Sequence, residues 1–292
     1  MDDNDWLAER FEGHRTHLRA VAYRMLGSLT EADDAVQEAW LRLSRTDTSD
    51  VENLGGWLTT VVGRVCLDML RSRRARREEP AGPHLPDPVV GRADGFDPEH
   101  QALLANSVGL ALLVVLDTLD PAERLAFVLH DMFGLPFDEI ASVVGRSSAA
   151  TRQLASRARR RVRGVSTTPD PDLSRQRVVV DAFFAAAHAG DFDRLVAVLD
   201  PDVVLRSDNG AVPGGALRTV RGAEAVAGQA LLFRRAGQTA TGEPALVNGA
   251  AGMVLRRAGK PQVVFGFTVV GGRIAEIDIL ADPERVAALV LE

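Results

Sequence analysis

The stretch LPFDEIASVVGRSSAATRQLASRARRRVRG, residues 135–164, decides how the middle of this chain folds. Its first part repeats apolar residues at spacings of three and four, from Phe137 to Val144, which predicts a helix with one buried face. Gly145 follows as a helix stop, and Ser147 is a favourable N-cap for a second helix. Two short helices joined by a tight turn form a helix-turn-helix, so the sequence predicts this motif here.

The second helix of this motif has an outer face that suits DNA. Seven arginines and no acidic residue lie between Arg146 and Arg163. Arginine and small polar side chains reach phosphates and base edges in a major groove. The alternative is a helical hairpin with a merely solvated charged face, but the single sign of charge and the inter-helix glycine favour DNA binding. The outer face comprises Ser148, Arg152, Gln153, Ser156, Arg157 and Arg160.

The chain as a whole is not basic. Its 292 residues include 34 Lys and Arg against 40 Asp and Glu, a formal net charge of −6, so DNA affinity must come from local clusters. This length predicts two or three domains. Cys66 is the single cysteine, so we expect no intrachain disulfide and no metal-ligand cluster. Met1–Asp5 is acidic and no apolar run reaches the roughly 18 residues of a membrane span, so we expect a cytoplasmic protein.

Three amphipathic helices are predicted before residue 78, at about 6–27, 31–44 and 57–74. The third ends in five arginines within seven residues, from Arg71 to Arg77. The helix macrodipole favours positive charge at this end, whereas a second phosphate-binding patch would account for so many arginines. The second helix has a polar face opposite its apolar face, which carries Asp34, Gln37, Glu38 and Arg42.

Residues 78–100 are predicted to be a connector. They contain five prolines and three glycines, so we expect an extended, semi-stiff segment that is not packed. At about 3.1 Å per residue, some 20 residues would span about 60 Å. Helices at about 97–116 and 121–132 then lead into the helix-turn-helix.

After residue 165 the pattern changes from helical to mixed. A short linker at 166–172 comes first, and the stretch Val269-Val270-Gly271-Gly272-Arg273-Ile274 is a two-residue hairpin signature. Helices followed by a meandering set of strands predict an α+β domain. The expected helices lie at about 174–189, 191–198, 223–234 and 282–290, and the expected strands at 203–207, 216–221, 240–247, 250–257, 261–270 and 273–280.

Three segments resemble the sigma-70 family. HRTHLRAVAYRMLGSLTEADDAVQEAWLRL (14–43) and GWLTTVVGRVCLDMLRSRRARR (56–77) resemble region 2, and LDPAERLAFVLHDMFGLPFDEIASVVGRSSAATRQLASRARRRV (119–162) resembles region 4. Two such regions joined by a linker are the layout of extracytoplasmic-function sigma factors. The resemblance implies two all-α domains, a region 2 bundle at 1–77 and a region 4 helix-turn-helix at 101–165, on either side of the linker 78–100.

The resemblance also implies partners. Region 2 docks on the coiled coil of the largest subunit of core RNA polymerase, region 4 docks on the flap of the second-largest subunit, and both contact promoter DNA. The implied polymerase-docking positions are Asp34, Gln37, Glu38 and Arg42. The implied −10 positions are Trp57, Thr60, Arg64, Asp68, Arg71 and Arg74. The implied −35 positions are Arg124, Ser148, Arg152, Gln153, Ser156 and Arg157.

Region 2 has two features that bear on strand opening. The loop 44–56 lies where such factors capture an unstacked base, and Trp57 either stacks on a base or anchors the core. Many members of the family have Arg-Asn where this chain has Gly63-Arg64.

Residues 173–292 resemble the SnoaL-like cone fold, also described as nuclear-transport-factor-like. A subgroup of these sigma factors carries such a domain, and the resemblance implies that it regulates activity in cis. The subgroup favours Asp-Gly-Gly-Gly-Lys where this chain has Ser207-Asp208-Asn209-Gly210-Ala211, a departure that argues against a linker contact through that segment. The phrase 82–88 resembles the subgroup's proline-rich linker motif, which implies linker contacts at Pro83, Leu85, Pro86, Asp87 and Pro88.

Two other functions stay open at this level. A repressor or activator could use the same helix-turn-helix, although it would need no docking helix and no melting segment at 31–77. A cone fold could also enclose a ligand pocket or an active site. We find no paired catalytic signature and expect a promoter-specificity subunit that is not an enzyme and needs no cofactor. The candidate polar groups of a pocket are His188, Asp191, Asp208 and Asp278, each of which is more typical of a helix end, a turn or the surface.

Overall fold

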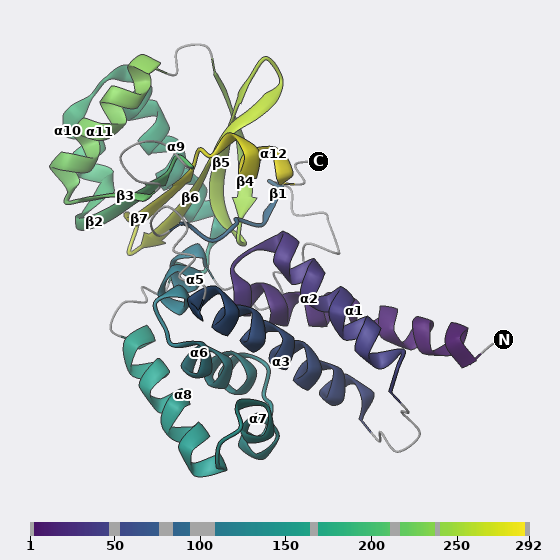
Figure 1. Ribbon diagram of the computed structural model, residues 1–292. Coiled ribbons are helices and arrows are strands. Elements are labelled where there is room, and N and C mark those ends of the chain that lie inside the picture. Colours follow the sequence, from purple (N-terminus) through teal and green to yellow (C-terminus); the bar gives the residue numbers. More distant parts are fainter. Residues whose placement is uncertain are drawn as a thin grey trace. The chain divides into compact units, whose positions relative to one another are not determined.

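The chain forms two compact units in a computed structural model that describes residues 3–46, 53–75, 84–93, 109–163, 169–210, 217–236 and 240–289 (Figure 1). One unit combines Met1–Glu79 with Leu113–Ser166 and is helical. The other combines Pro80–Leu112 with Thr167–Glu292 and contains the sheet. The connector predicted at 78–100 therefore belongs, in its described part, to the C-terminal unit.

The first half of the helical unit has the helices that the periodicity predicted. These are α1 (Asp3–Leu26), α2 (Leu29–Leu43) and α3 (Leu54–Ala75). Gly27, with φ 72°, ends α1 and donates its amide to the carbonyl of Tyr23 at 2.8 Å. The three helices bury a shared apolar core, and each fully buried leucine or methionine contributes about 1.5–3 kcal/mol to its stability. Fully buried members include Leu18, Met25, Leu43, Leu58 and Leu67.

The second half of this unit holds the helix-turn-helix. Its helices are α5 (Leu110–Asp117), which crosses the boundary between the units, α6 (Pro121–Phe127), α7 (Phe137–Val144) and α8 (Ser148–Arg163). The helix expected over 121–132 changes at residue 128 into a π-helical turn, η1 (Val128–Met132).

The turn between α7 and α8 confirms the sequence analysis. Gly145 adopts the left-handed conformation with φ 72°, and the amides of Gly145 and Arg146 both donate to the carbonyl of Ala141. The hydroxyl of Ser147 accepts the amide of Ala150 at 3.2 Å and so caps α8. A glycine stop followed by a serine cap fixes the angle at which α8 leaves α7.

The C-terminal unit is an α+β domain, as predicted. Its sheet has the order β1-β4-β5-β6-β7-β2-β3, and all neighbours are antiparallel except β2 and β7. The strands are β1 (Val90–Arg92), β2 (Leu199–Asp208), β3 (Leu217–Arg221), β4 (Thr241–Val247), β5 (Ala250–Arg257), β6 (Lys260–Val270) and β7 (Arg273–Leu280). The helices are α9 (Leu173–Ala189), α10 (Phe192–Val198), α11 (Ala223–Ala236) and α12 (Pro283–Ala288).

The core of this domain lies between its sheet and the helices α9, α10 and α11, which gather on one face (Figure 1). The ring of Phe267 lies there 5.8 Å from the ring of Phe183 and 6.3 Å from the ring of Phe265. The predicted hairpin joins β6 and β7 through Gly271 and Gly272, both with positive φ. The carboxylate of Asp170, just before α9, accepts both glycine amides at 3.1 Å.

The prediction of an unpacked connector is wrong for residues 84–93. Leu85, Pro86, Pro88, Val89 and Val90 are buried, and β1 pairs with β4 in the register Val90↔Val247. Proline is excluded from central strands because it lacks an amide donor, but it is tolerated beside an edge strand. Here the prolines precede a short edge strand, so the segment can join the sheet without losing a ladder hydrogen bond.

Candidate nucleic-acid interface and linker contact

The polar face of α2 is exposed, as expected of a docking surface. Asp34 and Gln37 are exposed and Glu38 and Arg42 are partly exposed, opposite the buried alanines of the same helix. Arg42 Nε lies 2.9 Å from Glu38 Oε1, an ion pair one helical turn long. Leu41, which the sequence analysis did not single out, lies beside them with 39% of its surface exposed.

A second polar stripe runs along α3. Its exposed residues Arg64, Asp68 and Arg71 follow one another at spacings of four and three, and Thr60 continues the stripe toward the helix start. Trp57, one turn earlier, is only partly buried, which disfavours its reading as a core anchor. Of the expected loop 44–56, residues 47–52 lie outside the described residues, as do the last two arginines of the cluster 71–77.

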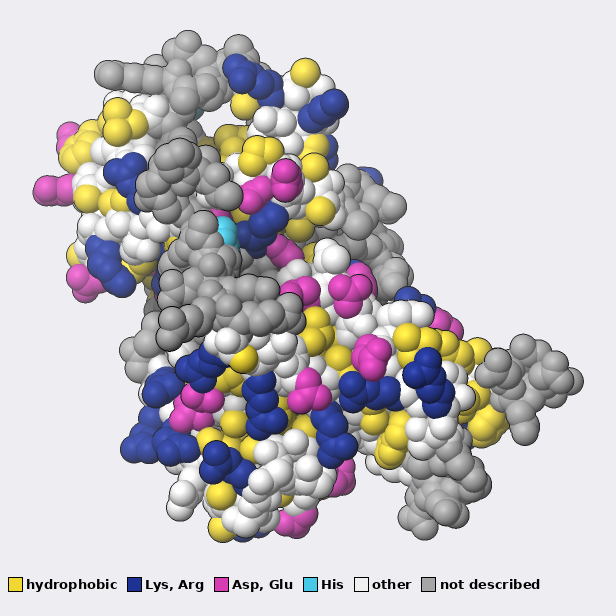
Figure 2. All heavy atoms as spheres, in the orientation of Figure 1, with side chains coloured by type: hydrophobic (Ala, Val, Ile, Leu, Met, Phe, Trp, Pro, Cys, Tyr) yellow, Lys and Arg dark blue, Asp and Glu magenta, His cyan; other side chains and the backbone are white. Residues whose placement is uncertain are grey.

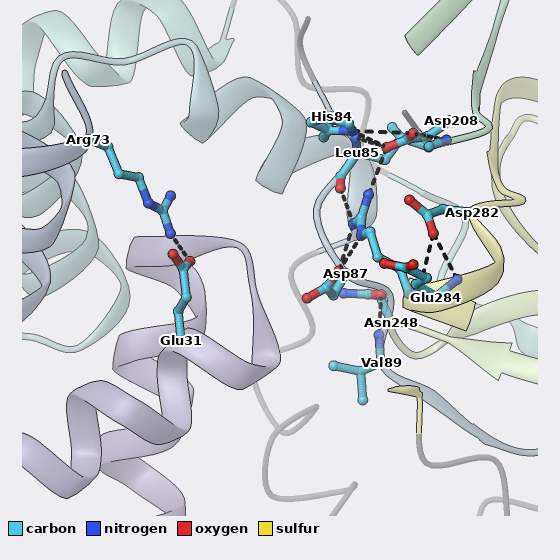
Figure 3. A network of polar contacts seen from close by, with 12 residues as sticks. Glu31, Arg73, His84, Leu85, Asp87, Val89, Asp208, Asn248, Asp282 and Glu284 are labelled. Atoms are coloured by element: carbon cyan, nitrogen blue, oxygen red, sulfur yellow. Dashed lines mark hydrogen bonds and ion pairs between the residues drawn. The ribbon is translucent and has the colours of Figure 1, made fainter. Parts of the chain in front are cut away.

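Several arginines of α3 already have protein partners. Arg64 Nη2 donates to the carbonyl of Ser142 in α7 at 3.3 Å, and Arg74 Nη1 lies 2.7 Å from Asp120 Oδ2. Arg73 pairs with Glu31 of α2 (Figure 3). Two of the expected −10 positions therefore contact the helix-turn-helix half of the chain.

The outer face of α8 is basic and exposed. Figure 2 shows Lys and Arg side chains gathered on the part of the surface formed by the helix-turn-helix region. Arg157 Nε lies 3.0 Å from Glu123 Oε1, and the Arg152 guanidinium lies 5.6 Å from the ring of Phe137, which orients it. The expected −35 residues that this exposed face contains are Arg152, Gln153, Ser156 and Arg157.

Two expected −35 positions are enclosed in this structure. Arg124 is 2% exposed, with Nε donating to the carbonyl of Arg24 at 3.2 Å and Nη1 lying 2.9 Å from Asp117 Oδ1. Burial lowers the pKa of the Arg124 guanidinium, and the neighbouring Asp117 opposes this. Since the guanidinium is enclosed, it cannot contact a phosphate in this structure. The hydroxyl oxygen of Ser148 is enclosed as well and has no hydrogen-bond partner among the described residues.

The linker contact is centred on Asp208 at the end of β2. This residue is fully buried, and its carboxylate accepts the amides of Leu85 at 2.9 Å and Gly210 at 3.1 Å. His84 Nδ1 lies 3.2 Å from Oδ2, and Arg285 Nη1 of α12 donates to the same oxygen at 2.7 Å (Figure 3). The expectation that the departure at 207–211 argues against a contact there is therefore wrong: one aspartate makes the contact.

Further side chains of the domain hold the same segment. Arg285 donates to the Asp87 carboxylate, with Nε at 2.9 Å, and to the carbonyl of Leu85. Asn248 makes two hydrogen bonds with the backbone of Val89. Its side-chain Oδ1 accepts the Val89 amide at 3.0 Å, and its own backbone amide donates to the Val89 carbonyl at 2.8 Å. Of the expected linker residues, Leu85 and Asp87 make these hydrogen bonds, Pro86 and Pro88 are buried, and Pro83 lies outside the described residues.

The domain side of this contact was missed by the sequence analysis. Arg285, Asn248 and Arg177, which donates to the carbonyl of Ala93, had no signal of their own. Asn248 has a positive φ of 49°, a conformation common in asparagine at turns.

The candidate pocket residues do not come together. His188 is exposed on α9, and Asp191 caps α10 by accepting the amide of Arg194 at 3.1 Å, so both are at a surface or helix end as expected. Asp208 and Asp278 are buried instead, which corrects the expectation for these two. The cluster of buried side chains between the sheet and its helices is apolar.

Asp278 lies in a buried ion-pair cluster. Arg206 Nη1 lies 3.0 Å from both Asp278 Oδ1 and Glu276 Oε2. Burial raises the pKa of Asp278 to about 6, and Arg206 opposes this rise while Glu276 adds to it. The cluster lies on β2 and β7, beside the linker contact, since Arg206 and Asp208 share one face of β2.

The described part of the chain holds no group of three or more His, Cys, Asp or Glu side chains suited to a metal ion. Nor does any helix among these residues have the length and apolarity needed to cross a membrane.

Comparison with known proteins bears on both units. Residues 10–76 match the family described as Sigma-70 region 2, and residues 109–162 match Sigma-70, region 4. The chain is 42% identical over 291 residues to the ECF RNA polymerase sigma factor SigJ of Mycobacterium tuberculosis, covering 94% of this chain and 91% of that one. It is 40% identical over 223 residues to the probable ECF RNA polymerase sigma factor SigI of the same species, covering 75% and 76%.

A solved structure extends this similarity to the fold. The crystal structure of the M. tuberculosis extracytoplasmic function sigma factor SigJ matches with a TM-score of 0.79 at 38% identity, covering 98% of this chain and all of that one. The match spans the helical regions and the C-terminal α+β domain. The chain therefore belongs to the ECF sigma factors of the SigJ type, which are promoter-specificity subunits of RNA polymerase and not enzymes.

Proposed function

We propose that the C-terminal domain regulates this sigma factor in cis by holding the linker between regions 2 and 4. The observation that carries the proposal is the contact of Asp208 and Arg285 with residues 84–87. The linker is the covalent connection between the two promoter-reading regions. Anchoring it on a folded domain therefore restricts the separations and orientations that the two regions can reach.

The chemistry of the contact favours a docked linker. A buried carboxylate that loses a donor retains the desolvation cost of its charge, about 1–3 kcal/mol for each lost partner. Asp208 is fully buried and takes one of its donors from the backbone of Leu85. The burial of Leu85, Val89 and Val90 adds a few kcal/mol of hydrophobic stabilisation, as an upper estimate.

The contact is also selective for this segment. The Arg285 guanidinium donates hydrogen bonds both to the backbone carbonyl of Leu85 and to the side-chain carboxylate of Asp87, two groups at a fixed spacing in the linker. Paired donors of a guanidinium add geometric specificity as well as energy. Strand β1 then continues along β4, as in peptide recognition by strand addition.

The promoter and polymerase contacts belong to the same proposal. Sigma factors bind core RNA polymerase and promoter DNA, so this chain is expected to act in the cytoplasm, where it meets both. We assign core docking on the largest-subunit coiled coil to Asp34, Gln37, Glu38 and Arg42, with region 4 on the flap of the second-largest subunit. We assign −10 binding to Trp57, Thr60, Arg64, Asp68, Arg71 and Arg74. We assign −35 binding to Arg152, Gln153, Ser156 and Arg157.

Promoter opening then needs no chemistry from this chain. Capture of flipped bases by region 2 offsets the few kcal/mol needed to unstack and unpair them. The exposed arginines of α3 and α8 supply a phosphate-binding contribution that weakens as salt rises.

The test compares run-off transcription by core polymerase with the full chain, with residues 1–170 and with Arg285→Ala, from a pool of genomic promoters. We expect the truncation and Arg285→Ala to change the transcript yield in the same direction while core binding persists. Arg175→Ala is the matched control, because Arg175 is an exposed arginine whose ion pair among the described residues is a local one, with Asp172 at 3.5 Å. Equal yields from the full chain, the truncation and Arg285→Ala would refute control through the linker.

A further inference from the structure

The arginines of α8 differ in what holds them. Arg157 and Arg161 both pair with Glu123 of α6, at 3.0 Å from Nε to Oε1 and at 2.9 Å from Nη1 to Oε2. Arg159 pairs with Asp131 of η1 at 2.6 Å. A guanidinium that is bound to a carboxylate has fewer N–H groups left for DNA and must exchange one anionic partner for another. These ion pairs therefore serve first to hold α8 on the helices that precede it.

Arg152 is held in a different way. Its side chain is exposed and has no carboxylate partner among the residues that the structure describes. Its guanidinium lies 5.6 Å from the ring centroid of Phe137, within the roughly 6 Å over which a cation is attracted to an aromatic face. This attraction restricts the side chain but accepts none of its N–H groups, so the donors stay available to DNA. A guanidinium held in this way is preorganised for a base edge, which it reads with two donors in a fixed fork.

Phe137 is placed to hold a side chain of the neighbouring helix. It is the first residue of α7 and is only partly buried, whereas Ile140, Ala141 and Val144 of the same helix are buried. One part of its ring is therefore enclosed, and the rest is accessible to the long side chain of Arg152. Arginine commonly lies along such apolar surface while its charged end stays in water.

The ring of Phe137 is itself held by a second ring. His130 of η1 stacks on it, with the two centroids 3.8 Å apart and the ring planes at 28°. His130 Nδ1 lies 2.9 Å from the carbonyl oxygen of Leu135. Because a carbonyl oxygen only accepts, Nδ1 carries the hydrogen and donates it, which fixes the orientation of the imidazole. The stacked imidazole limits rotation of the Phe137 ring, so the direction of the face that attracts Arg152 is set.

The π-helical turn brings His130 to this place. A π turn contains one residue more than an α-helical turn, which shifts the side chains that follow, and such turns are frequent at functional sites. Directly after η1 the chain reverses. The Gly134 amide donates to the His130 carbonyl at 3.0 Å, and the Leu135 amide donates to the Leu129 carbonyl at 2.9 Å. This reversal brings the start of α7 back onto η1, so the two rings can stack.

We propose that the stacked pair of His130 and Phe137 positions Arg152 and so sets how strictly this sigma factor discriminates bases in the −35 element. The two rings are positioning residues, which act through the direction of one guanidinium. The inference rests on the proposed −35 assignment of Arg152. It predicts that loss of either ring lowers base discrimination where Arg152 reads the promoter, while the charge of α8 stays the same.

The experiment uses holoenzyme assembled from core polymerase and the full chain, together with a pool of promoter duplexes whose −35 segment is randomised. Sequencing of the bound duplexes gives the discrimination at each base pair. Arg152→Ala should lower discrimination at the base pairs that Arg152 reads, and should also lower the salt dependence of binding. Phe137→Leu should lower discrimination at the same base pairs by about two- to fivefold, the range of an exposed cation–π contact. Because Phe137→Leu removes no charge, the salt dependence should not change.

Three further variants separate positioning from folding. Phe137→Tyr keeps the ring and should keep the discrimination of the wild type to within about twofold. Val143→Ala shortens a buried side chain of the same helix, so it should destabilise the helical unit without changing discrimination. His130→Ala should lower discrimination in the wild-type chain but not further in Arg152→Ala, where no guanidinium remains to be oriented. It also serves as the test if Phe137→Leu fails to fold.

The outcomes separate this inference from the proposed function. If Arg152→Ala loses discrimination but Phe137→Leu keeps the profile of the wild type, the positioning role is overturned and the −35 assignment stands. A uniform loss at all base pairs in Phe137→Leu, with the same loss in Val143→Ala, would mean that the ring only supports the fold, which also overturns the positioning role. A profile that Arg152→Ala leaves unchanged would refute the −35 assignment, and this inference with it.

Discussion

The substitution Asp208→Asn tests the linker contact most directly. Asp208 is fully buried, and its carboxylate oxygens accept from Leu85, Gly210 and Arg285 at 2.9, 3.1 and 2.7 Å. Asparagine keeps the shape but has a single acceptor oxygen, and its amide group would face donors. Hydrogen bonds to a charged group contribute about 1.5–3 kcal/mol each. Because Arg285 keeps Asp87 as a partner, we expect the docked linker to lose about 2–4 kcal/mol.

Native-state hydrogen exchange is the suitable assay. The Val89 amide donates to Asn248 Oδ1 at 3.0 Å and is protected only while the linker is docked. A loss of 2–4 kcal/mol corresponds to exchange about 30- to 900-fold faster when local opening controls exchange. The amide of Phe267, in a central strand, serves as a reference for opening of the whole domain.

Two results would refute this reasoning. One is a Val89 exchange rate that Asp208→Asn leaves within a few-fold of wild type. The other is equal acceleration at Val89 and Phe267, which would mean that the whole domain was destabilised. Asp191→Asn is the matched control, because that carboxylate caps α10 and does not contact the linker.

Three further predictions concern pH, DNA and the helix-turn-helix. Burial raises the pKa of Asp278 to about 6, so the folded domain favours the protonated carboxyl. The free energy of unfolding of the domain should therefore fall as pH rises from about 4 to about 6, by about 2–3 kcal/mol at most. In thermal melts from pH 4 to 8, the Asp278→Asn variant should show a smaller fall in stability than the wild type. Parallel curves of stability against pH for the two proteins would contradict this prediction. Arg152→Ala should weaken binding of a −35 duplex and lower the salt slope by about 1, whereas Arg124→Met should leave DNA binding unchanged and the helical unit equally or more stable. A fluorescence titration of the −35 duplex at several salt concentrations compares the two variants. Equal losses of DNA affinity in Arg152→Ala and Arg124→Met would mean that Arg124 contacts DNA. Gly145→Ala should destabilise the helical unit by about 1–2 kcal/mol, because alanine is strained at the φ of 72° that Gly145 adopts. Gly13→Ala in α1 should instead stabilise the unit by up to about 1 kcal/mol, because a Cβ at that position meets nothing within 4 Å. Denaturant titrations of the two variants measure both effects.

Periodic and punctuating residues made most elements predictable. The helices of both sigma regions and the strands β4 to β7 follow from apolar spacing, and Gly145 and Gly271-Gly272 mark turns that only glycine adopts easily. The exposed residues of α2 and α8 follow from the same spacing, because the face opposite an apolar stripe must meet water.

The residues whose burial was not predicted share a different physical origin. Arg124 and Asp208 are charged residues whose partners lie 100 or more positions away in the chain, at Arg24 and at Leu85. No local pattern reveals that a distant segment will supply a hydrogen bond to a buried charge. The linker was misread for a related reason, since its prolines exclude helix and central strand but leave an edge position on another domain available.

Strand β1 covers the edge of β4 at one end of the sheet. A sheet edge presents unpaired amides and carbonyls to which other chains can add, and proteins protect such edges. Here the protecting strand for Ala245–Val247 of β4 is part of the linker itself. Any state in which the linker detaches therefore uncovers a surface prone to self-association, and a released sigma factor should aggregate unless a partner takes up one of its parts quickly.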